Sequence, residues 1–152
     1  MGFLARLLGG TDDRELATDL VAAYRAEAEH AEHLRQHAAR ARYPQAADAL
    51  RRLAEQEDRH AAALRDLLVA AGGGVPPVAP DPLPGGNPWE RAVAAQREAQ
   101  TKRREMVQRM NRWDPDAAES VAVMRRIERE DGAVMAVYND LVMRADPHSL
   151  DD

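Results

Sequence analysis

The sequence predicts an all-α protein in which two antiparallel helical hairpins, joined by a long Pro/Gly-rich crossover, form a four-helix bundle. Three observations support this fold class. The chain is rich in Ala, Leu, Arg and Glu, and aromatic residues make up only 4% of it, a composition that favours helices packed on helices. Apolar residues recur at helical spacing in four segments. Residues 72–86, between the second and third segments, contain five prolines and no helical pattern.

The first hairpin is predicted from two helices and a short turn. The first helix begins at Asp12, where Glu15 completes a capping box, and runs to about Arg42, because Pro44 disfavours helix at the residue before it. The second helix begins at Pro44 and ends at the glycines of residues 72–74. Such a short connection makes the two helices antiparallel neighbours, so the middle of one faces the middle of the other.

The length of the proline-rich run indicates how the hairpins are connected. An extended segment of about 15 residues spans roughly 45 Å at ~3.1 Å per residue. A helix of about 28 residues is roughly 42 Å long at ~1.5 Å per residue. The run can therefore return along the whole bundle, which predicts that the helices before and after it are parallel.

The second hairpin has equally clear boundaries. Its first helix opens with Asn87 as N-cap, Pro88 at the first position and Glu90 at the third. Its second helix begins after residues 114–116 and ends near Arg144. The predicted inward stripe of the first helix is Trp89, Val93, Gln96, Ala99, Arg103, Met106 and Met110. That of the second is Val121, Met124, Ile127, Asp131, Val134, Tyr138 and Leu141.

Composition and charge narrow the domain organisation and the function classes. We expect an N-terminal arm at residues 1–11, one bundle at 12–145 with its crossover at 71–87, and a tail at 146–152. The formal net charge is −5 with acids and bases interleaved, which argues against a nucleic-acid partner. Without cysteine, carboxylates and imidazoles are the available metal ligands. The sequence shows neither a transmembrane span nor a convincing signal peptide, so we expect a cytoplasmic protein.

A polar group on the inward face of the second helix is the main functional signal. Glu57 and His60 are three residues apart and therefore adjacent on a helix, within an otherwise apolar stripe. Glu27 is the carboxylate on the inward stripe of the first helix, and it can face them. His30, three residues after Glu27, can point at the same place. A metal ion is the usual partner of Glu-x-x-His on an inward helix face.

These features resemble the ferritin-like, rubrerythrin-type superfamily. The resemblance covers roughly Asp12 to Arg144. It implies that each hairpin supplies a Glu and a Glu-x-x-His, which together hold two iron or manganese ions that react with dioxygen or peroxide. By position, Glu27, Glu57 and His60 match the first half of this pattern. The resemblance also implies a homodimer, and an external electron donor because the family's paired-cysteine electron-transfer domain is absent.

The second hairpin departs from the family pattern. Its first helix offers Gln96 where a Glu is expected, with Glu98 off the seam. Its second helix offers Asp131 and Val134 in place of Glu-x-x-His, and Val134 cannot bind a metal. A buried cation at Arg103 would seek a carboxylate, which Asp131 or Glu27 could provide, and such a pair would replace a lost metal ion with a permanent positive charge. Glu128 and Glu130 are nearby, but on this register they lie beside the seam or on the outer face, and only a slip of the register could bring one of them in.

Three states of the centre remain open from the sequence. The first is a dinuclear oxidase or peroxidase site with Gln96 and Asp131 as unusual ligands. The second is one Fe, Mn or Zn ion held by Glu27, Glu57 and His60, with His30 or Asp131 as a fourth ligand. The third is a metal-free bundle, stabilised by pairs with Arg103, that serves as a structural or protein-interaction module.

Overall fold

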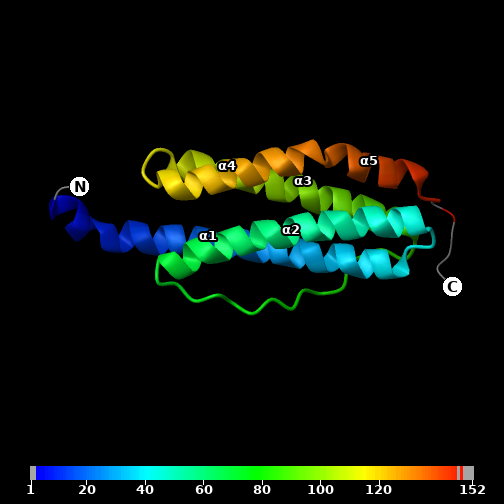
Figure 1. The fold of residues 1–152 in the computed structure, drawn as a ribbon, viewed down its shortest axis with the longest axis horizontal. Coiled ribbons are helices and arrows are strands. Elements are labelled where there is room, and N and C mark those ends of the chain that lie inside the picture. The colour runs from blue at the N-terminus through cyan, green and yellow to red at the C-terminus, as the bar shows by residue number, and fades with distance from the viewer. Residues whose placement is uncertain (1–2, 147, 149–152) are drawn as a thin grey trace.

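The structure is a computed structural model that describes residues 3–146 and 148, with side chains from Asp12 onward. Five helices lie along one long axis (Figure 1), and the described residues contain no strand. They are α1 (Phe3–Arg40), α2 (Pro44–Ala70), α3 (Pro88–Trp113), α4 (Ala118–Ala133) and α5 (Met135–Arg144). The predicted all-α fold class is confirmed.

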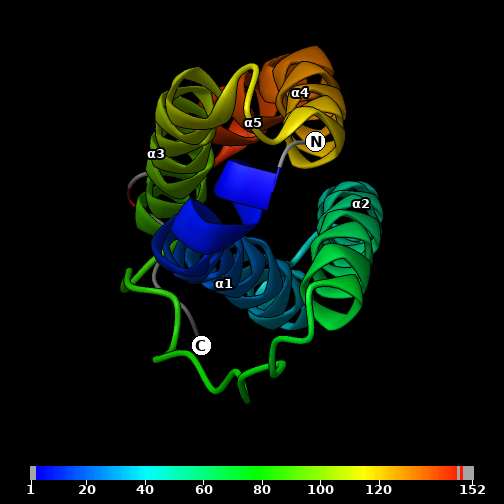
Figure 2. The same cartoon turned by 90° about the vertical axis from the view of Figure 1, so that its left-hand side faces the viewer.

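The order of the helices in space is that of a bundle with one long crossover. Seen end-on, α1, α2, α3 and the α4–α5 pair surround a common core, and the connection between α2 and α3 passes outside it (Figure 2). The green connection in Figure 1 returns along the bundle, so α2 and α3 run in the same direction. It is attached to α1, because the backbone N–H of Leu83 donates to Oε1 of Gln36 at 3.1 Å and the Leu83 side chain is buried.

The first helix starts earlier than the sequence analysis predicts. α1 begins at Phe3 and continues through Asp12 without interruption. Residues 4–8 are all strong helix formers and no proline lies between them and Asp12, so the helix can continue through the capping signal at Asp12. The predicted N-terminal arm is therefore part of α1 from Phe3 onward, and its first two residues lie outside the described residues. Of the predicted tail, only residues 146 and 148 are described.

The last helix is divided in two at Val134. Its φ and ψ are −101° and 2°, and its N–H bonds to the carbonyl of Asp131, three residues back, at 3.3 Å. Two positions earlier, an added Cβ at Gly132 would lie 2.8 Å from a guanidinium nitrogen of Arg103. Glycine at this position thus admits the arginine, and the adjacent break separates α4 from α5.

The inward face of α3 differs from the predicted stripe by about one residue. The structure buries the alanines at 92, 95 and 99 together with Lys102 and Met106, whereas Trp89 is 38% exposed. Arg103, predicted to be inward, lies at the edge, where it pairs with Glu128 at 2.7 Å. Alanines occur on adjacent faces of this helix, so the apolar pattern alone does not determine which face packs against α1.

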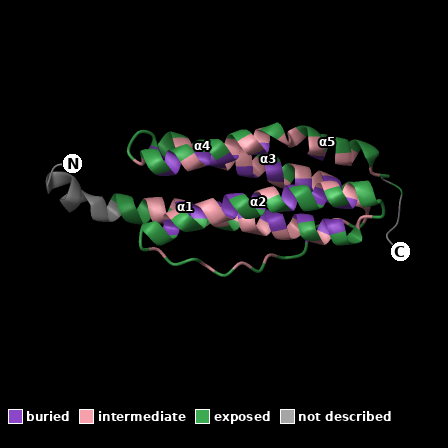
Figure 3. Ribbon diagram, in the orientation of Figure 1, coloured by how far each residue is buried: buried purple, intermediate pink, exposed green. Residues whose placement is uncertain are grey.

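Two apolar clusters form the core, and a polar layer separates them. Figure 3 shows that the buried residues follow the facing sides of the helices. One cluster consists of Leu34, Ala38, Leu50, Leu53, Ala54, Ala95, Ala99 and Tyr138. The other consists of Leu20, Ala23, Leu64, Leu68, Met106, Met124 and Ile127. The residues between these two sets lie at one level of the bundle. Most of the buried polar side chains are at this level: Glu27, His30, Glu57, His60, Lys102 and Asp131.

Candidate metal centre

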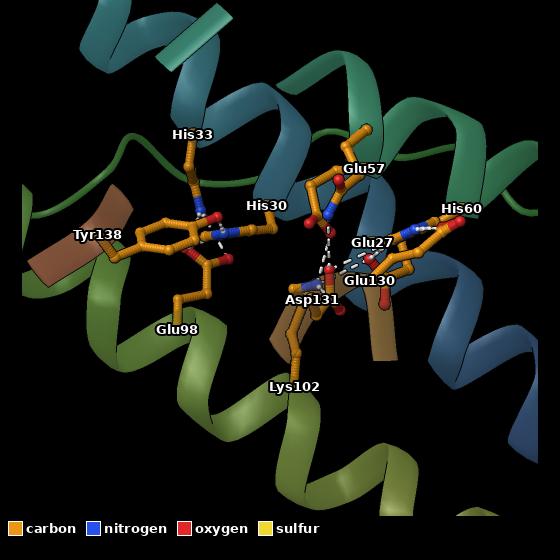
Figure 4. Close-up of polar contacts among 11 residues, drawn as sticks. Glu27, His30, His33, Glu57, His60, Glu98, Lys102, Glu130, Asp131 and Tyr138 are labelled. Carbon is orange, nitrogen blue, oxygen red and sulfur yellow. Dashed lines mark hydrogen bonds and ion pairs between the residues drawn. The ribbon is translucent and has the colours of Figure 1, made fainter. Parts of the chain in front are cut away.

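Five buried side chains from four helices meet in this polar layer (Figure 4). Glu27 comes from α1, Glu57 and His60 from α2, Lys102 from α3 and Asp131 from α4. None of these residues is more than 5% exposed. Burying this many ionisable groups is unfavourable unless they compensate one another, so their mutual contacts define the centre.

The ammonium group of Lys102 lies among the three carboxylates. Its Nζ donates to Oε2 of Glu27 at 2.7 Å, to Oε2 of Glu57 at 2.5 Å and to Oδ2 of Asp131 at 3.3 Å. These contacts use the three hydrogens of an ammonium group. Burial by itself would lower the pKa of Lys102, but the charges of Glu27, Glu57 and Asp131 outweigh it and raise the pKa. Lys102 is therefore a permanent cation in the centre.

His60 is held by a carboxylate outside the cluster and points its other nitrogen into the cluster. Its Nε2 donates to Oε2 of Glu130 at 2.9 Å, and the Glu130 side chain is 45% exposed. Its Nδ1 lies 3.4 Å from Oδ1 of Asp131 and 3.7 Å from Oε2 of Glu27. Hydrogen bonding of one ring nitrogen to a carboxylate is the usual way in which proteins orient a metal-ligating histidine.

The Nδ1 atom of His60 requires a positive partner. A lone pair that faces two carboxylate oxygens is repelled by them unless a proton or a metal ion lies between. Burial would lower the pKa of His60, but the carboxylates of Asp131 and Glu27 outweigh burial and raise the pKa to about 9. The His60 Nδ1 and Glu27 Oε1 atoms are both buried without a hydrogen-bond partner. Both atoms can therefore serve as ligands without breaking an existing hydrogen bond.

The two glutamates differ in their protonation behaviour. Burial would raise the pKa of Glu27, but the Lys102 ammonium outweighs it and holds the pKa well below its usual range. Burial and the adjacent charge of Glu27 raise the pKa of Glu57 well above its usual range. Two carboxylates so close together resist ionising at the same time, so Glu57 is the one that accepts a proton when no further cation is present.

The donor set fits one metal ion. Glu27, Glu57, His60 and Asp131 each offer a ligand atom, and these atoms lie within 4.8 Å of one another. Two ligands of a tetrahedral ion with bonds of ~2.1 Å are about 3.4 Å apart, close to the spacings around His60 Nδ1. A pair of ions fits poorly, because the Lys102 ammonium already fills the position among the three carboxylates.

His30 belongs to a second polar group and not to this centre. Its Nε2 lies 2.7 Å from the hydroxyl of Tyr138, and its Nδ1 lies 3.1 Å from Oε2 of Glu98. Glu98 also contacts Nδ1 of His33 at 2.9 Å. Burial lowers the pKa of His30, despite the opposing effect of Glu98. The sequence predicts His30 as a candidate ligand, but the structure turns it towards Tyr138 (Figure 4).

Two further predicted positions lie away from the centre. Gln96 donates a hydrogen bond to the side chain of Asn139 and does not join the carboxylates. Val134 lies at the break between α4 and α5 and offers no ligand atom. Asp131 is therefore the one predicted candidate from the second hairpin that the structure brings to Glu27, Glu57 and His60.

A comparison with protein families matches the part of the chain that forms the first hairpin. A family model described as Rubrerythrin matches residues 10–79, which include the helical segments that carry Glu27, Glu57 and His60. Over these residues the first hairpin is similar to the rubrerythrin family. Together with the crossover topology, this match confirms the resemblance to the ferritin-like, rubrerythrin-type superfamily. The second hairpin of this ferritin-like bundle, which supplies Lys102 and Asp131, lies outside the matched residues. No curated protein matches the chain.

Lys102 is the residue of the centre that the sequence analysis missed. A buried cation was predicted one position later, at Arg103, because the face of α3 was assigned one residue away. A signal was available: Lys102 is the only lysine in the chain, against 20 arginines. Arginine and lysine are not interchangeable, since a compact ammonium group fits among several carboxylates where a planar guanidinium does not.

Proposed function

We propose that this protein is a ferritin-like metal-binding protein that holds a single divalent ion at Glu27, Glu57, His60 and Asp131. The observation that carries the proposal is the buried Nδ1 atom of His60, which faces Asp131 and Glu27 at 3.4 and 3.7 Å without a hydrogen bond. Two or three carboxylates and one imidazole suit Fe, Mn or Zn.

The formal charge of the centre supports one divalent ion. Three carboxylates and one ammonium sum to −2 when His60 is neutral, and one divalent ion brings the total to zero. In a low-dielectric interior, neutrality of this kind strongly favours binding. When no metal is bound, protons on His60 and Glu57 provide the same compensation, because both groups have raised pKa values.

The residues of the chain have separate roles in this proposal. Glu130 orients His60 through the Nε2 hydrogen bond, Lys102 positions the carboxylates, and the two apolar clusters exclude water from above and below.

A bound iron or manganese ion would supply reactivity towards O₂ or H₂O₂. Electrons would come from an external donor, and we propose a homodimer in the cytoplasm. None of the helices in the described residues has an apolar stretch suited to crossing a bilayer.

Metal analysis tests this proposal directly. Protein purified without chelator, then dialysed against Mn²⁺, Fe²⁺ or Zn²⁺, should hold about one ion per chain by plasma mass spectrometry. His60→Ala and Glu57→Ala should abolish binding. Glu55→Ala is the matched control, because Glu55 lies on the same helix but is exposed, and it should bind like the wild type. Wild-type protein that retains no ion under any of these conditions would contradict the proposal.

The second candidate is a metal-free bundle that acts as a structural or protein-interaction module. The contacts of Lys102 with three carboxylates favour it, since they compensate much of the buried negative charge without an ion. It predicts that His60→Ala and Glu55→Ala have the same metal content as the wild type, which is none. The metal analysis above therefore separates the two candidates.

A further inference from the structure

The centre contains two positions that require positive charge. The first lies among Oε2 of Glu27, Oε2 of Glu57 and Oδ2 of Asp131, and the Nζ atom of Lys102 occupies it at 2.7, 2.5 and 3.3 Å. The second lies between Nδ1 of His60 and the oxygens of Glu27 and Asp131. Among the described side chains, His60 Nδ1 has no hydrogen-bond partner. One cation is thus part of the chain, and the other must be acquired.

We infer that the ammonium group of Lys102 takes the place of a second metal ion, so that the centre accepts one ion and reversing the charge at residue 102 opens a second metal position. This inference builds on the proposed function, since it concerns the same carboxylates. It adds a specific role for Lys102, as the residue that sets the number of ions.

Charge and space both exclude a second ion while Lys102 is present. One divalent ion neutralises the formal charge of −2, and a second ion would leave +2 in a buried layer, which is strongly unfavourable. The ammonium also fills the space among the three carboxylate oxygens that a bridging ion would need. Lys102 is only 4% exposed, so its ammonium group is held within the buried layer.

Replacing Lys102 by an acid reverses both the charge and the space that exclude a second ion. Lys102→Glu leaves four carboxylates with a formal charge of −4, which two divalent ions neutralise. Lys102 projects from α3 towards acids on α1, α2 and α4, so a carboxylate at this position would add a ligand from the helix that otherwise supplies none. Glutamate is also shorter than lysine, which leaves room for an ion between it and the other carboxylates.

The test compares Lys102→Glu with Arg103→Glu. Both variants change the charge by the same amount on neighbouring residues, but the Arg103 side chain is 34% exposed and pairs with Glu128 outside the centre. After dialysis against Mn²⁺ or Zn²⁺, native mass spectrometry should show one more ion per chain in Lys102→Glu than in the wild type. Arg103→Glu should show none. No gain in a folded Lys102→Glu, or an equal gain in both variants, would overturn the inference.

A second measurement needs no substitution. Because Lys102 is the only lysine, it is the only side-chain amine that reductive methylation modifies, and mass spectrometry reports its reaction separately. Methylation of Lys102 should be at least about 100-fold slower in the native protein than in denaturant, both before and after addition of one equivalent of Zn²⁺. Rapid methylation after Zn²⁺ addition would mean that the ion displaces the ammonium, which would overturn the inference.

These outcomes are distinguishable from failure of the proposed function. A wild-type protein without metal contradicts the proposed function, whereas the inference depends on the additional ion gained by Lys102→Glu and on the protection of the Lys102 amine. If Lys102→Glu does not fold, the methylation measurement on wild-type protein still decides.

Discussion

The Nζ atom of Lys102 lies 2.5 Å from Oε2 of Glu57, and this contact joins the two hairpins of the bundle. Lys102 belongs to α3 and Glu57 to α2, which are not neighbours along the wall of the bundle (Figure 2). The pair therefore crosses the interior. A buried ion pair of this kind is costly to break, because each partner left alone is an uncompensated charge.

Removing the buried cation should destabilise the protein. In the presence of a chelator at pH 7, Lys102→Met should lower the free energy of unfolding by about 3–5 kcal/mol, because it leaves the carboxylates of Glu27, Glu57 and Asp131 uncompensated. Urea denaturation followed by circular dichroism measures this difference. Arg35→Met is the control: the Arg35 ion pairs are exposed and should contribute less than about 1 kcal/mol. Equal losses in the two variants would contradict the central role of Lys102.

The stability of the metal-free protein should fall as the pH rises through the pKa of His60. The folded-state pKa of His60 is raised to about 9 from 6.5, so the folded protein binds this proton more tightly than the unfolded chain. The contribution is fully present below pH 6.5 and is lost between pH 6.5 and 9. Thermal unfolding with chelator across this range should show the decline. His60→Gln should flatten it, and a wild-type stability that rises over this window would refute the assignment.

Metal affinity should increase with pH over a similar range. An ion at Nδ1 of His60 must displace the proton held there, so the affinity for Zn²⁺ or Mn²⁺ should rise about tenfold per pH unit for each proton released. Calorimetric titrations in two buffers of different ionisation enthalpy count the protons. Affinity that is independent of pH from 6 to 8 would place the ion away from His60.

Glu130 should tune metal affinity without holding the ion itself. Its carboxylate accepts the Nε2–H of His60 at 2.9 Å, and loss of such a partner typically weakens metal binding about 10–100-fold. Glu130→Gln should show this loss by competition with a chromogenic chelator, with little change in unfolding free energy because the side chain is half exposed. Glu55→Gln, on the outer face of α2, should match the wild type. An unchanged affinity in Glu130→Gln would remove the orienting role.

The hydroxyl of Tyr138 should contribute to stability but not to metal stoichiometry. It lies 2.7 Å from Nε2 of His30, which is fully buried, and Tyr138→Phe leaves this nitrogen unsatisfied at a cost of about 1–3 kcal/mol. Tyr24→Phe, at a half-buried position, is the control and should cost less. A change in bound metal for Tyr138→Phe would place His30 in the metal centre after all.

Local spacing was sufficient to predict the first hairpin and its part of the centre. Glu57 and His60 are adjacent on any helix because they are three residues apart. Pro44 begins the second helix directly after the first, so only a short turn connects the two helices. An antiparallel pair with such a turn places Glu27 opposite Glu57 and His60. The length and proline content of the crossover likewise fixed the parallel direction of α2 and α3.

The second hairpin depended on packing between distant helices. The first half of α3 carries alanines at positions 92, 94, 95 and 99, which lie on adjacent faces, so the apolar pattern fits two orientations that differ by one residue. Contact with α1, α2 and α4 selects the orientation that buries Lys102 and leaves Arg103 at the edge. The turn of His30 towards Tyr138 also results from a contact between distant helices.

The amino-acid sequence by itself determined a helical bundle with a buried acid and an acid–imidazole pair in its first half, because helical periodicity and turn length are local properties. Only the tertiary structure decided that a lysine ammonium completes this layer, because its position depends on three helices approaching α3 from different parts of the chain.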